Sequence, residues 1–268
     1  MKINTKIPSV LLMLVLAASA SAELDFTGQS AQEYGLAIAT EFKARNQGWH
    51  NSESTLTMTL RNANGEENIR KIRIKTLEVE GDGDKSLTIF DQPRDIKGAA
   101  FLTFSHVSGS DDQWLYLPAL ARVKRISSRN KSGPFMASQF AYEDLSSFEI
   151  EKYTYRYLGM ETIDERDCYK VELVLLDELS GYTRQVIWID KEHFRAYKID
   201  YYDRKESLMK TLTFSEYELY LKQYWRAIQA NMVNHQTQKS TLLHTDKIAF
   251  RTGLIESDFN KTSLKRAH

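Results

Sequence analysis

The stretch that decides the fold runs from Lys97 to Phe148 and contains two apolar, strand-like runs, Ala99-Ala-Phe-Leu-Thr-Phe104 and Trp114-Leu-Tyr-Leu117. A third apolar run follows, Gly133-Pro-Phe-Met-Ala-Ser-Gln-Phe-Ala-Tyr142, in which the proline interrupts any β-ladder. Its large apolar side chains recur at spacings that favour one short helical face over an alternating strand. Such a segment beside a sheet is typical of a lid over a cavity or of an ordinary core helix, and the pattern alone does not separate the two. The side chains in question are Phe135, Met136, Phe140 and Tyr142.

The N-terminal residues have the composition of a secretory signal peptide. Lys2 and Lys6 precede an apolar run from Ile7 to Ala18, and Ala20-Ser-Ala22 matches a small-x-small cleavage site. The run is shorter than a membrane-spanning helix requires. No twin arginine precedes it and no cysteine follows the cleavage site, which argues against Tat export and lipidation. We therefore expect Sec export, cleavage before Glu23 and a soluble, non-lipidated extracytoplasmic protein; a retained signal anchor is the alternative.

Charge and cysteine content narrow the class of protein. The chain has 36 basic and 36 acidic residues, and removal of Lys2 and Lys6 leaves 34 basic residues, a net charge of −2. This balance argues against a nucleic-acid partner, which needs a basic surface to neutralise phosphates. Cys168 is the only cysteine, so no intrachain disulfide can form. It lies in a strand-like run without a nearby histidine, and we expect a buried, inert thiol rather than a reactive one.

One helix and a long series of strands are predicted along the mature chain. Ser30 and Glu33 form a capping-box pattern at the start of a helix over Ala31 to Arg45. Period-two alternation follows, in hairpin order and without a βαβ rhythm, which predicts a mainly β fold with a few helices: one strongly curved antiparallel sheet forming an incomplete, half-open barrel in a single domain, 23–268. Eleven strands are predicted: Thr55–Leu60, Ile69–Val79, Lys85–Phe90, Gly98–Ser105, Gln113–Leu117, Ala121–Ile126, Phe148–Met160, Cys168–Leu176, Gln185–Ile189, Ala196–Tyr202 and Lys210–Tyr217. Two further candidates, Trp225–Val233 and Thr241–Phe250, would bring the number to thirteen.

The sequence contains no recognisable catalytic or metal-binding motif. The six histidines never fall in His-x-His or His-Glu-x-x-His spacing. Ser108-Gly-Ser110 lacks the flanking glycines of a nucleophile elbow, and Gly81-Asp-Gly-Asp84 lacks the downstream oxygen ligands of a calcium loop. We therefore expect a protein that is not an enzyme and that uses neither a metal nor a cofactor.

A basic cluster lies between the second apolar strand and the lid segment. Arg122, Lys124 and Arg125 are followed by two further cations, Arg129 and Lys131. Arg122 and Lys124 share one face of a predicted strand, where they could contact an anionic headgroup or an acidic partner surface. An equally good interpretation is a sheet edge that its charges protect from aggregation.

The central block resembles a known family. Asp91-Gln-Pro-Arg-Asp-Ile-Lys-Gly98, Asp112-Gln-Trp-Leu-Tyr-Leu-Pro118 and Arg122-Val-Lys-Arg-Ile126 are similar to the outer-membrane lipoprotein-sorting protein family, a branch of the LolA-like superfamily. The segments Ser132–Leu145 and Gly253–Leu264 resemble this family as well. The resemblance covers essentially all of the mature chain, and its central block is the most specific part.

The resemblance implies an incomplete, curved barrel whose apolar concavity is covered by helices. It further implies a periplasmic carrier or chaperone for a lipid or lipid-modified molecule, in transient contact with a membrane or receptor. This branch is often associated with exporters of the resistance-nodulation-division (RND) type. We expect the apolar groove and its lid to consist of Phe101, Phe104, Trp114, Tyr116, Phe135, Met136, Phe140 and Tyr142.

The competing hypothesis is a protein-interaction module. An accessory or sensor subunit of an exporter or envelope regulator would have a solid core and would bind no lipid. A carrier, by contrast, should co-purify with acyl chains.

Processing of the precursor is directly testable. Signal peptidase should remove residues 1–22, because Ala20-Ser-Ala22 meets its small-residue requirement while the apolar run is too short to anchor the chain. The intact mass of the exported protein should correspond to a chain that starts at Glu23. A membrane-retained chain that still carries Met1 would contradict this expectation.

Overall fold

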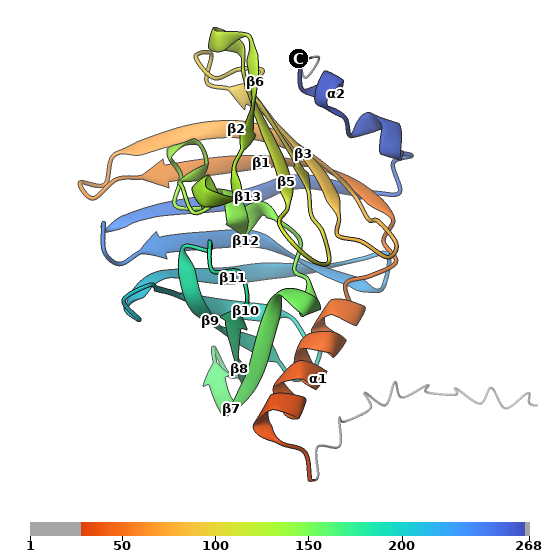
Figure 1. The fold of residues 1–268 in the computed structure, drawn as a ribbon, viewed down its shortest axis with the longest axis vertical. Coiled ribbons are helices and arrows are strands. Elements are labelled where there is room, and N and C mark those ends of the chain that lie inside the picture. The colour runs from red at the N-terminus through yellow and green to blue at the C-terminus, as the bar shows by residue number, and fades with distance from the viewer. Residues whose placement is uncertain (1–27, 266–268) are drawn as a thin grey trace, which may run out of the picture.

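The computed structural model describes residues 28–265, and the predicted signal peptide, residues 1–22, lies outside them. Within the described residues the chain forms two α-helices and thirteen strands, joined by turns and short 3-10 helices (Figure 1). The elements are α1 (Ala31–Ala44), β1 (Asn51–Arg61), β2 (Glu67–Leu77), β3 (Lys85–Gln92), β4 (Ala100–Phe104), β5 (Asp112–Leu117), β6 (Arg122–Ile126), β7 (Tyr153–Ile163), β8 (Arg166–Leu175), β9 (Tyr182–Asp190), β10 (Ala196–Asp203), β11 (Leu208–Tyr220), β12 (Tyr224–Asn234), β13 (Lys239–Phe250) and α2 (Lys261–Lys265).

All the strands belong to one curved antiparallel sheet. Their order is β6-β5-β4-β3-β2-β1-β13-β12-β11-β10-β9-β8-β7, so β1 pairs with both β2 and β13 while β6 and β7 form the two edges. The edges do not pair with each other, and the barrel stays open. The predicted fold class, a mainly β half-open barrel, is confirmed.

Helix α1 packs directly on the β7 edge. Its N-terminus is closed by the predicted capping box, in which the Ser30 hydroxyl accepts from the Glu33 N–H and the Glu33 carboxylate accepts from the Ser30 N–H. A Cβ at Gly35 would lie 2.9 Å from the backbone nitrogen of Arg156 in β7, so only glycine permits this close approach. Ile38 is fully buried against the same strands. The helix predicted over 31–45 is confirmed.

Residues 127–152 connect β6 to β7 and therefore run from one edge of the sheet to the other. Figure 1 shows this segment, in lime green, crossing in front of the middle strands on the concave side of the sheet. We call it the crossover segment. Its last turn, Ile150–Lys152, is a 3-10 helix, so the strand predicted from Phe148 begins only at Tyr153. The ring of Phe148 packs on that of Phe42 in α1 instead of joining the sheet.

The helix predicted within the crossover segment is wrong. Gly133–Tyr142 forms a tight loop in which the N–H of Phe135 donates to the carbonyl of Phe140 at 2.7 Å, across the loop rather than along a helix. Met136 and Ala137 have φ values of 47° and 61°, in the left-handed region that an α-helix excludes. The spacing of Phe135, Phe140 and Tyr142 therefore follows from the path of this loop and not from a helical repeat.

Successive residues of β4 and β5 face two different cores. On the concave side, Phe135 of the crossover segment is buried between Phe90 and Phe101. On the opposite side, the C-terminal residues Phe259 and Leu264 cover Leu102 of β4 and Trp114 of β5. Side chains therefore fill the concave face around Phe135, and the C-terminal residues cover the opposite face of β3–β5.

Candidate functional site

The β8–β13 half of the concave face encloses a cavity. It has a volume of about 680 Å³ and lies between the crossover segment and the sheet. We call it the apolar cavity, because half of its lining residues are aliphatic or aromatic and most of these come from the strands of the sheet. This size is within the range of pockets that hold small molecules. The apolar lining residues are Phe140, Leu145, Phe148, Tyr153, Leu175, Leu176, Tyr182, Ile199, Tyr201, Leu212, Phe214, Ala230 and Leu243.

A buried ion pair holds the crossover segment over this cavity. The Lys210 ammonium in β11 lies 2.9 Å from a carboxylate oxygen of Asp144, and both side chains are only 4% exposed. The Lys210 ammonium also donates to the carbonyl of Gln139 at 3.0 Å. The Asp144 carboxylate accepts from the N–H of Ala141 at 2.7 Å and from the hydroxyl of Tyr182 at 2.9 Å. Lys210 thus ties the segment to β11 and Tyr182 ties it to β9, while the bond from Ala141 holds the segment's own backbone.

Burial beside this pair changes the acidity of the neighbouring phenols. Desolvation raises the pKa of Tyr182 and that of Tyr201 well above the usual range, and the Asp144 carboxylate adds to both shifts. Both tyrosines therefore stay neutral across the physiological range. Their rings lie 4.9 Å and 5.5 Å from the Lys210 ammonium and contribute cation–π attraction.

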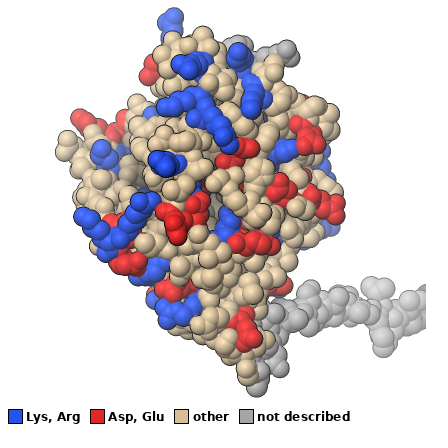
Figure 2. Space-filling view, in the orientation of Figure 1, with Lys and Arg blue, Asp and Glu red and all other residues tan. Residues whose placement is uncertain are grey.

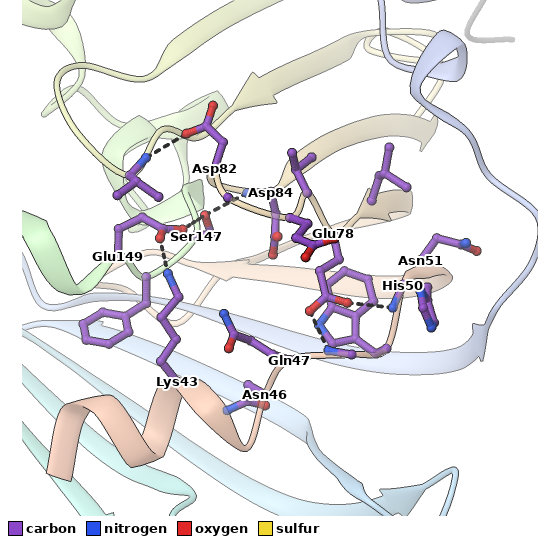
Figure 3. A pocket seen from close by; sticks show the side chains of 18 of the residues that line it. Lys43, Asn46, Gln47, His50, Asn51, Glu78, Asp82, Asp84, Ser147 and Glu149 are labelled. Carbon is purple, nitrogen blue, oxygen red and sulfur yellow. Dashed lines mark hydrogen bonds and ion pairs between the residues drawn. The ribbon is translucent and has the colours of Figure 1, made fainter. Parts of the chain in front are cut away.

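A second cavity, of about 1130 Å³, lies at the end of the sheet near the C-terminus of α1 (Figure 3). We call it the polar cavity. Lys43 extends from α1 to pair with Glu149, whose side chain is 2% exposed, and the Ser147 hydroxyl donates to the same carboxylate at 2.6 Å.

The Glu78 carboxylate accepts from the N–H groups of Gly48 and His50 at 2.7 and 2.8 Å, which fixes the loop after α1.

Two aspartates of the β2–β3 turn have opposite pKa shifts. Burial raises the pKa of Asp84 to about 6, and the nearby carboxylates of Glu78 and Glu149 add to the rise. The pKa of Asp82 falls to about 2, chiefly because its carboxylate accepts from the N–H of Val107 and secondly from the ring of His106. The Asp84 carboxylate therefore titrates at about pH 6.

The structure brings together only part of the predicted groove. Phe101, Phe135 and Tyr142 form one cluster with ring centroids 5.1 to 5.8 Å apart, and half-buried Met136 packs against it. This cluster is solid core. Among the predicted groove and lid residues, Phe140 lines the apolar cavity.

Three of the predicted groove residues face the other side of the sheet, which corrects the prediction. Phe104, Trp114 and Tyr116 pack under the C-terminal residues, and Trp114 lies 4.5 Å below the Lys261 ammonium. Strand alternation explains this: Leu102 pairs with Trp114, whereas Phe101 pairs with Leu115 on the concave side.

The predicted basic cluster lies on the edge strand β6. Arg122, Lys124 and Arg125 are all exposed, and Arg125 pairs with Asp112. Figure 2 shows basic side chains predominating at the upper end of the molecule, where β6 lies. The cluster is remote from the apolar cavity, so its charges suit an outer contact or the protection of an edge.

Sequence reasoning missed most of the residues that line the apolar cavity. They come from β8 to β13, whose alternation was recognised but whose inward face was not identified. Ile199 and Tyr201, then Leu212 and Phe214, repeat at the interval of two residues that marks one face. That repeat is the available signal, and only the crossover segment identifies which face is the inner one.

No helix within residues 28–265 has both the length and the apolar character needed to cross a bilayer. Within the same residues, no three His, Cys, Asp or Glu side chains converge as potential metal ligands.

A family model and a solved structure both match most of this chain. A family model described as an uncharacterized protein matches residues 82–266. An outer membrane lipoprotein-sorting protein domain from Vibrio parahaemolyticus is 60% identical, with 88% of this chain and 100% of that one covered and a TM-score of 0.86. The comparison with curated proteins finds no match.

Two more distant structures share the fold. A DUF1329 family protein from Desulfovibrio piger is 28% identical, with coverage of 88% and 100% and a TM-score of 0.84. A LolA superfamily protein from Nitrosomonas europaea is 20% identical, with coverage of 87% and 99% and a TM-score of 0.69. The latter supports the fold alone.

Breaking the buried ion pair should strongly destabilise the protein. Lys210→Met leaves the Asp144 charge buried without its cation, and the free energy of unfolding should fall by about 3–5 kcal/mol. Urea denaturation at neutral pH measures this loss. As a control, Arg61→Met removes a pair with Glu67 that is largely exposed and should cost about 0.5 kcal/mol or less. Equal losses in the two variants would contradict the anchoring role of Lys210.

The raised pKa of Asp84 predicts that removing its charge stabilises the protein at neutral pH but not at acidic pH. Because its folded-state pKa lies above that of an unfolded aspartate, the contribution of Asp84 to stability should fall as pH rises from about 4 to about 6. Asp84→Asn should therefore raise the free energy of unfolding at about pH 7.5 by roughly 1–2 kcal/mol and change it little at about pH 4. Urea denaturation at both pH values measures the effect.

Asp82→Asn is the matched control for this prediction. Its lowered pKa means that the ionised form is favoured in the folded state, so the substitution should destabilise the protein at neutral pH. A loss of stability in Asp84→Asn at about pH 7.5 would refute the assignment.

Proposed function

Because this chain belongs to the outer-membrane lipoprotein-sorting protein family of the LolA-like superfamily, we propose that it is a periplasmic carrier for a lipid or lipid-modified molecule. Its sorting relative from Vibrio parahaemolyticus matches along the whole length of that chain. The observation that carries the proposal is the apolar cavity of about 680 Å³ beneath the crossover segment. A sheet that served only as a scaffold would be expected to fill this space with side chains, as Phe135 fills the space between Phe90 and Phe101.

The energetics of transport require such a cavity. Each buried methylene is worth roughly 0.8 kcal/mol, so an acyl chain of about 14 carbons carries about 11 kcal/mol of unfavourable hydration in water. The apolar lining from β8 to β13 can replace that water. The carrier works without covalent chemistry in this proposal, since the cavity needs only to bind and release.

Release requires an acceptor or a conformational change. A receptor or membrane must offer comparable burial, or the crossover segment must move so that the cavity weakens. The family resemblance suggests an RND-type exporter as the membrane partner. The exposed cations Arg122 and Lys124 on β6 support a transient contact of this kind.

Filling the cavity tests the proposal. Ala230→Phe places a ring among the lining residues, and it should reduce the amount of co-purifying lipid by roughly 5- to 10-fold. Asn231→Phe is the control, because the adjacent side chain of β12 points to the opposite face of the sheet. Mass spectrometry of organic extracts from gently purified protein measures acyl chains per chain.

The outcomes separate the two candidate functions. Retention of lipid by wild type and Asn231→Phe, with loss in Ala230→Phe, supports the carrier. Absence of acyl chains from wild-type protein, purified without detergent, would favour an accessory or sensor subunit that binds no lipid. Denaturation midpoints of the three proteins check that each is folded.

A further inference from the structure

A third cavity opens where strands β10 and β11 separate. Residues 198–202 of β10 pair with residues 208–213 of β11, but β11 then continues to Tyr220 paired only with β12. The gap between the β9–β10 turn and the far half of β11 holds a cavity of about 660 Å³, closed on one side by the end of α1. The hydroxyl of Tyr217 donates to the carbonyl of Ala196 across this gap. We call it the basic cavity.

The charge of this cavity differs from that of the other two. Four cationic side chains line it, and none of its described lining residues is acidic. The polar cavity is lined by Glu and Asp from several elements, and the lining of the apolar cavity includes Glu143, Asp144 and other carboxylates that outnumber its two lysines. The interior of the half-barrel is thus divided into acidic and basic regions. The cations of the basic cavity are Arg45, Arg195, Lys222 and Arg226.

Two of these four cations have carboxylate partners outside the cavity. Arg45 pairs with Glu41 at 2.7 Å, and Arg195 pairs with the buried Asp190 at 2.8 Å. Lys222 is exposed at the tip of the β11–β12 hairpin and forms no ion pair with the residues from 28 to 265.

Arg226 is the partly buried cation of this cavity that has no carboxylate partner among the described residues. One guanidinium nitrogen, Nη1, donates to the Asn46 amide oxygen at 2.8 Å and to the Trp225 carbonyl at 2.9 Å. A guanidinium has five N–H donors, and no carboxylate in the described range forms an ion pair with this one. Glu78 and Asp84 act on it only through space from the polar cavity, and burial is the main cause of its lowered pKa. Its remaining donors suit a bidentate oxyanion.

The basic cavity adjoins the apolar cavity and the polar cavity. Phe214 and Ala230 line both the basic and the apolar cavity, and Phe42 and Arg226 line both the basic and the polar cavity. Phe214 and Ala230 are paired neighbours on β11 and β12, so an acyl chain lying across this pair would reach the apolar lining while its polar end stays beside the cations. The aromatic ring of Trp225, 4.7 Å from the Arg195 guanidinium, adds a flat wall at the polar end.

We propose that the basic cavity binds the oxyanion headgroup, of phosphate class, of a lipid whose acyl chains occupy the apolar cavity. Arg226 holds the oxyanion through its free N–H donors, and Lys222 closes the site from the hairpin. The inference deepens the proposed carrier function and rests on it. A free phosphate presents the same chemistry, so the test must distinguish the two sources.

Calorimetric titration with three ligands makes this distinction. The probes are dioctanoyl phosphatidic acid, dioctanoyl glycerol, which has the same chains without the phosphate, and inorganic phosphate. Wild-type protein should bind the phosphatidic acid about 10- to 100-fold more tightly than the glycerol, the gain expected of charge-assisted hydrogen bonds. Arg226→Gln should abolish most of that difference and leave the binding of dioctanoyl glycerol unchanged.

Two further variants keep the test independent of folding. Lys222→Gln changes an exposed hairpin residue, so it should fold normally and weaken only the phosphatidic acid, by about 3- to 10-fold. Arg61→Gln removes the same charge from the distant β1–β2 hairpin and should alter neither affinity. Added salt should weaken the phosphatidic acid alone.

Each other outcome overturns the headgroup site in a recognisable way. Equal affinities of wild type for the two lipids, or equal losses for both lipids in Lys222→Gln, would reject the headgroup site and leave the carrier function intact. Binding of neither lipid would reject both proposals. Binding of inorganic phosphate without either lipid would identify a site for a free anion instead.

Discussion

The structure depends on the connection between the two edges of its sheet. β6 and β7 follow each other in the chain but lie at opposite ends of the strand order, so residues 127–152 must cross the concave face. A segment that runs through an apolar interior has to satisfy its own backbone groups, because unpaired buried N–H and C=O groups are costly. The loop bond from Phe135 to Phe140 and the acceptance of the Ala141 N–H by Asp144 meet this requirement. The crossover segment covers the concave face of the half-barrel because β6 and β7 lie at opposite edges of the sheet.

The two halves of the concave face are filled differently because the crossover segment is anchored differently over each. Over β3 and β4 it inserts Phe135 between Phe90 and Phe101, and the side chains close the space. Over β9 and β11 it is held by the ion pair of Asp144 with Lys210, which fixes the position of the backbone without filling the volume beside it. A buried pair is a poor source of net stability but a strong positional constraint, since each charge can be buried only beside the other. The cavity persists next to the pair for this reason.

Local signals explain how much of the fold was predictable. Helix α1 was identified from Ser30 and Glu33 because capping is decided within one turn, and the strands were identified because period-two alternation is decided within a few residues. The faces of those strands were not predictable in the same way. Trp114 was placed in the groove, yet it lies beneath the C-terminal residues, a contact between segments more than a hundred positions apart.

The loop at Gly133–Tyr142 was predicted as a helix because its conformation depends on partners in distant strands. Arg70 of β2 donates to the Met136 carbonyl, and Lys210 of β11 donates to the Gln139 carbonyl. Sequence spacing carries no information about such partners.

The distribution of charge inside the half-barrel bears on how a carrier orients its ligand. Apolar contact alone does not fix which end of a lipid faces outward, because burial is non-directional. Acidic side chains outnumber basic ones in the linings of the polar and apolar cavities and would repel an anionic headgroup, whereas the basic cavity would attract it. A lipid bound in this way has its headgroup in the gap between β10 and β11 and its chains beneath the crossover segment. Its polar end then stays next to the exposed β11–β12 hairpin, where a membrane or receptor can contact it first. Transfer can therefore begin at the headgroup while the chains are still shielded from water, so the hydration cost of the acyl chains need not be met in a single step.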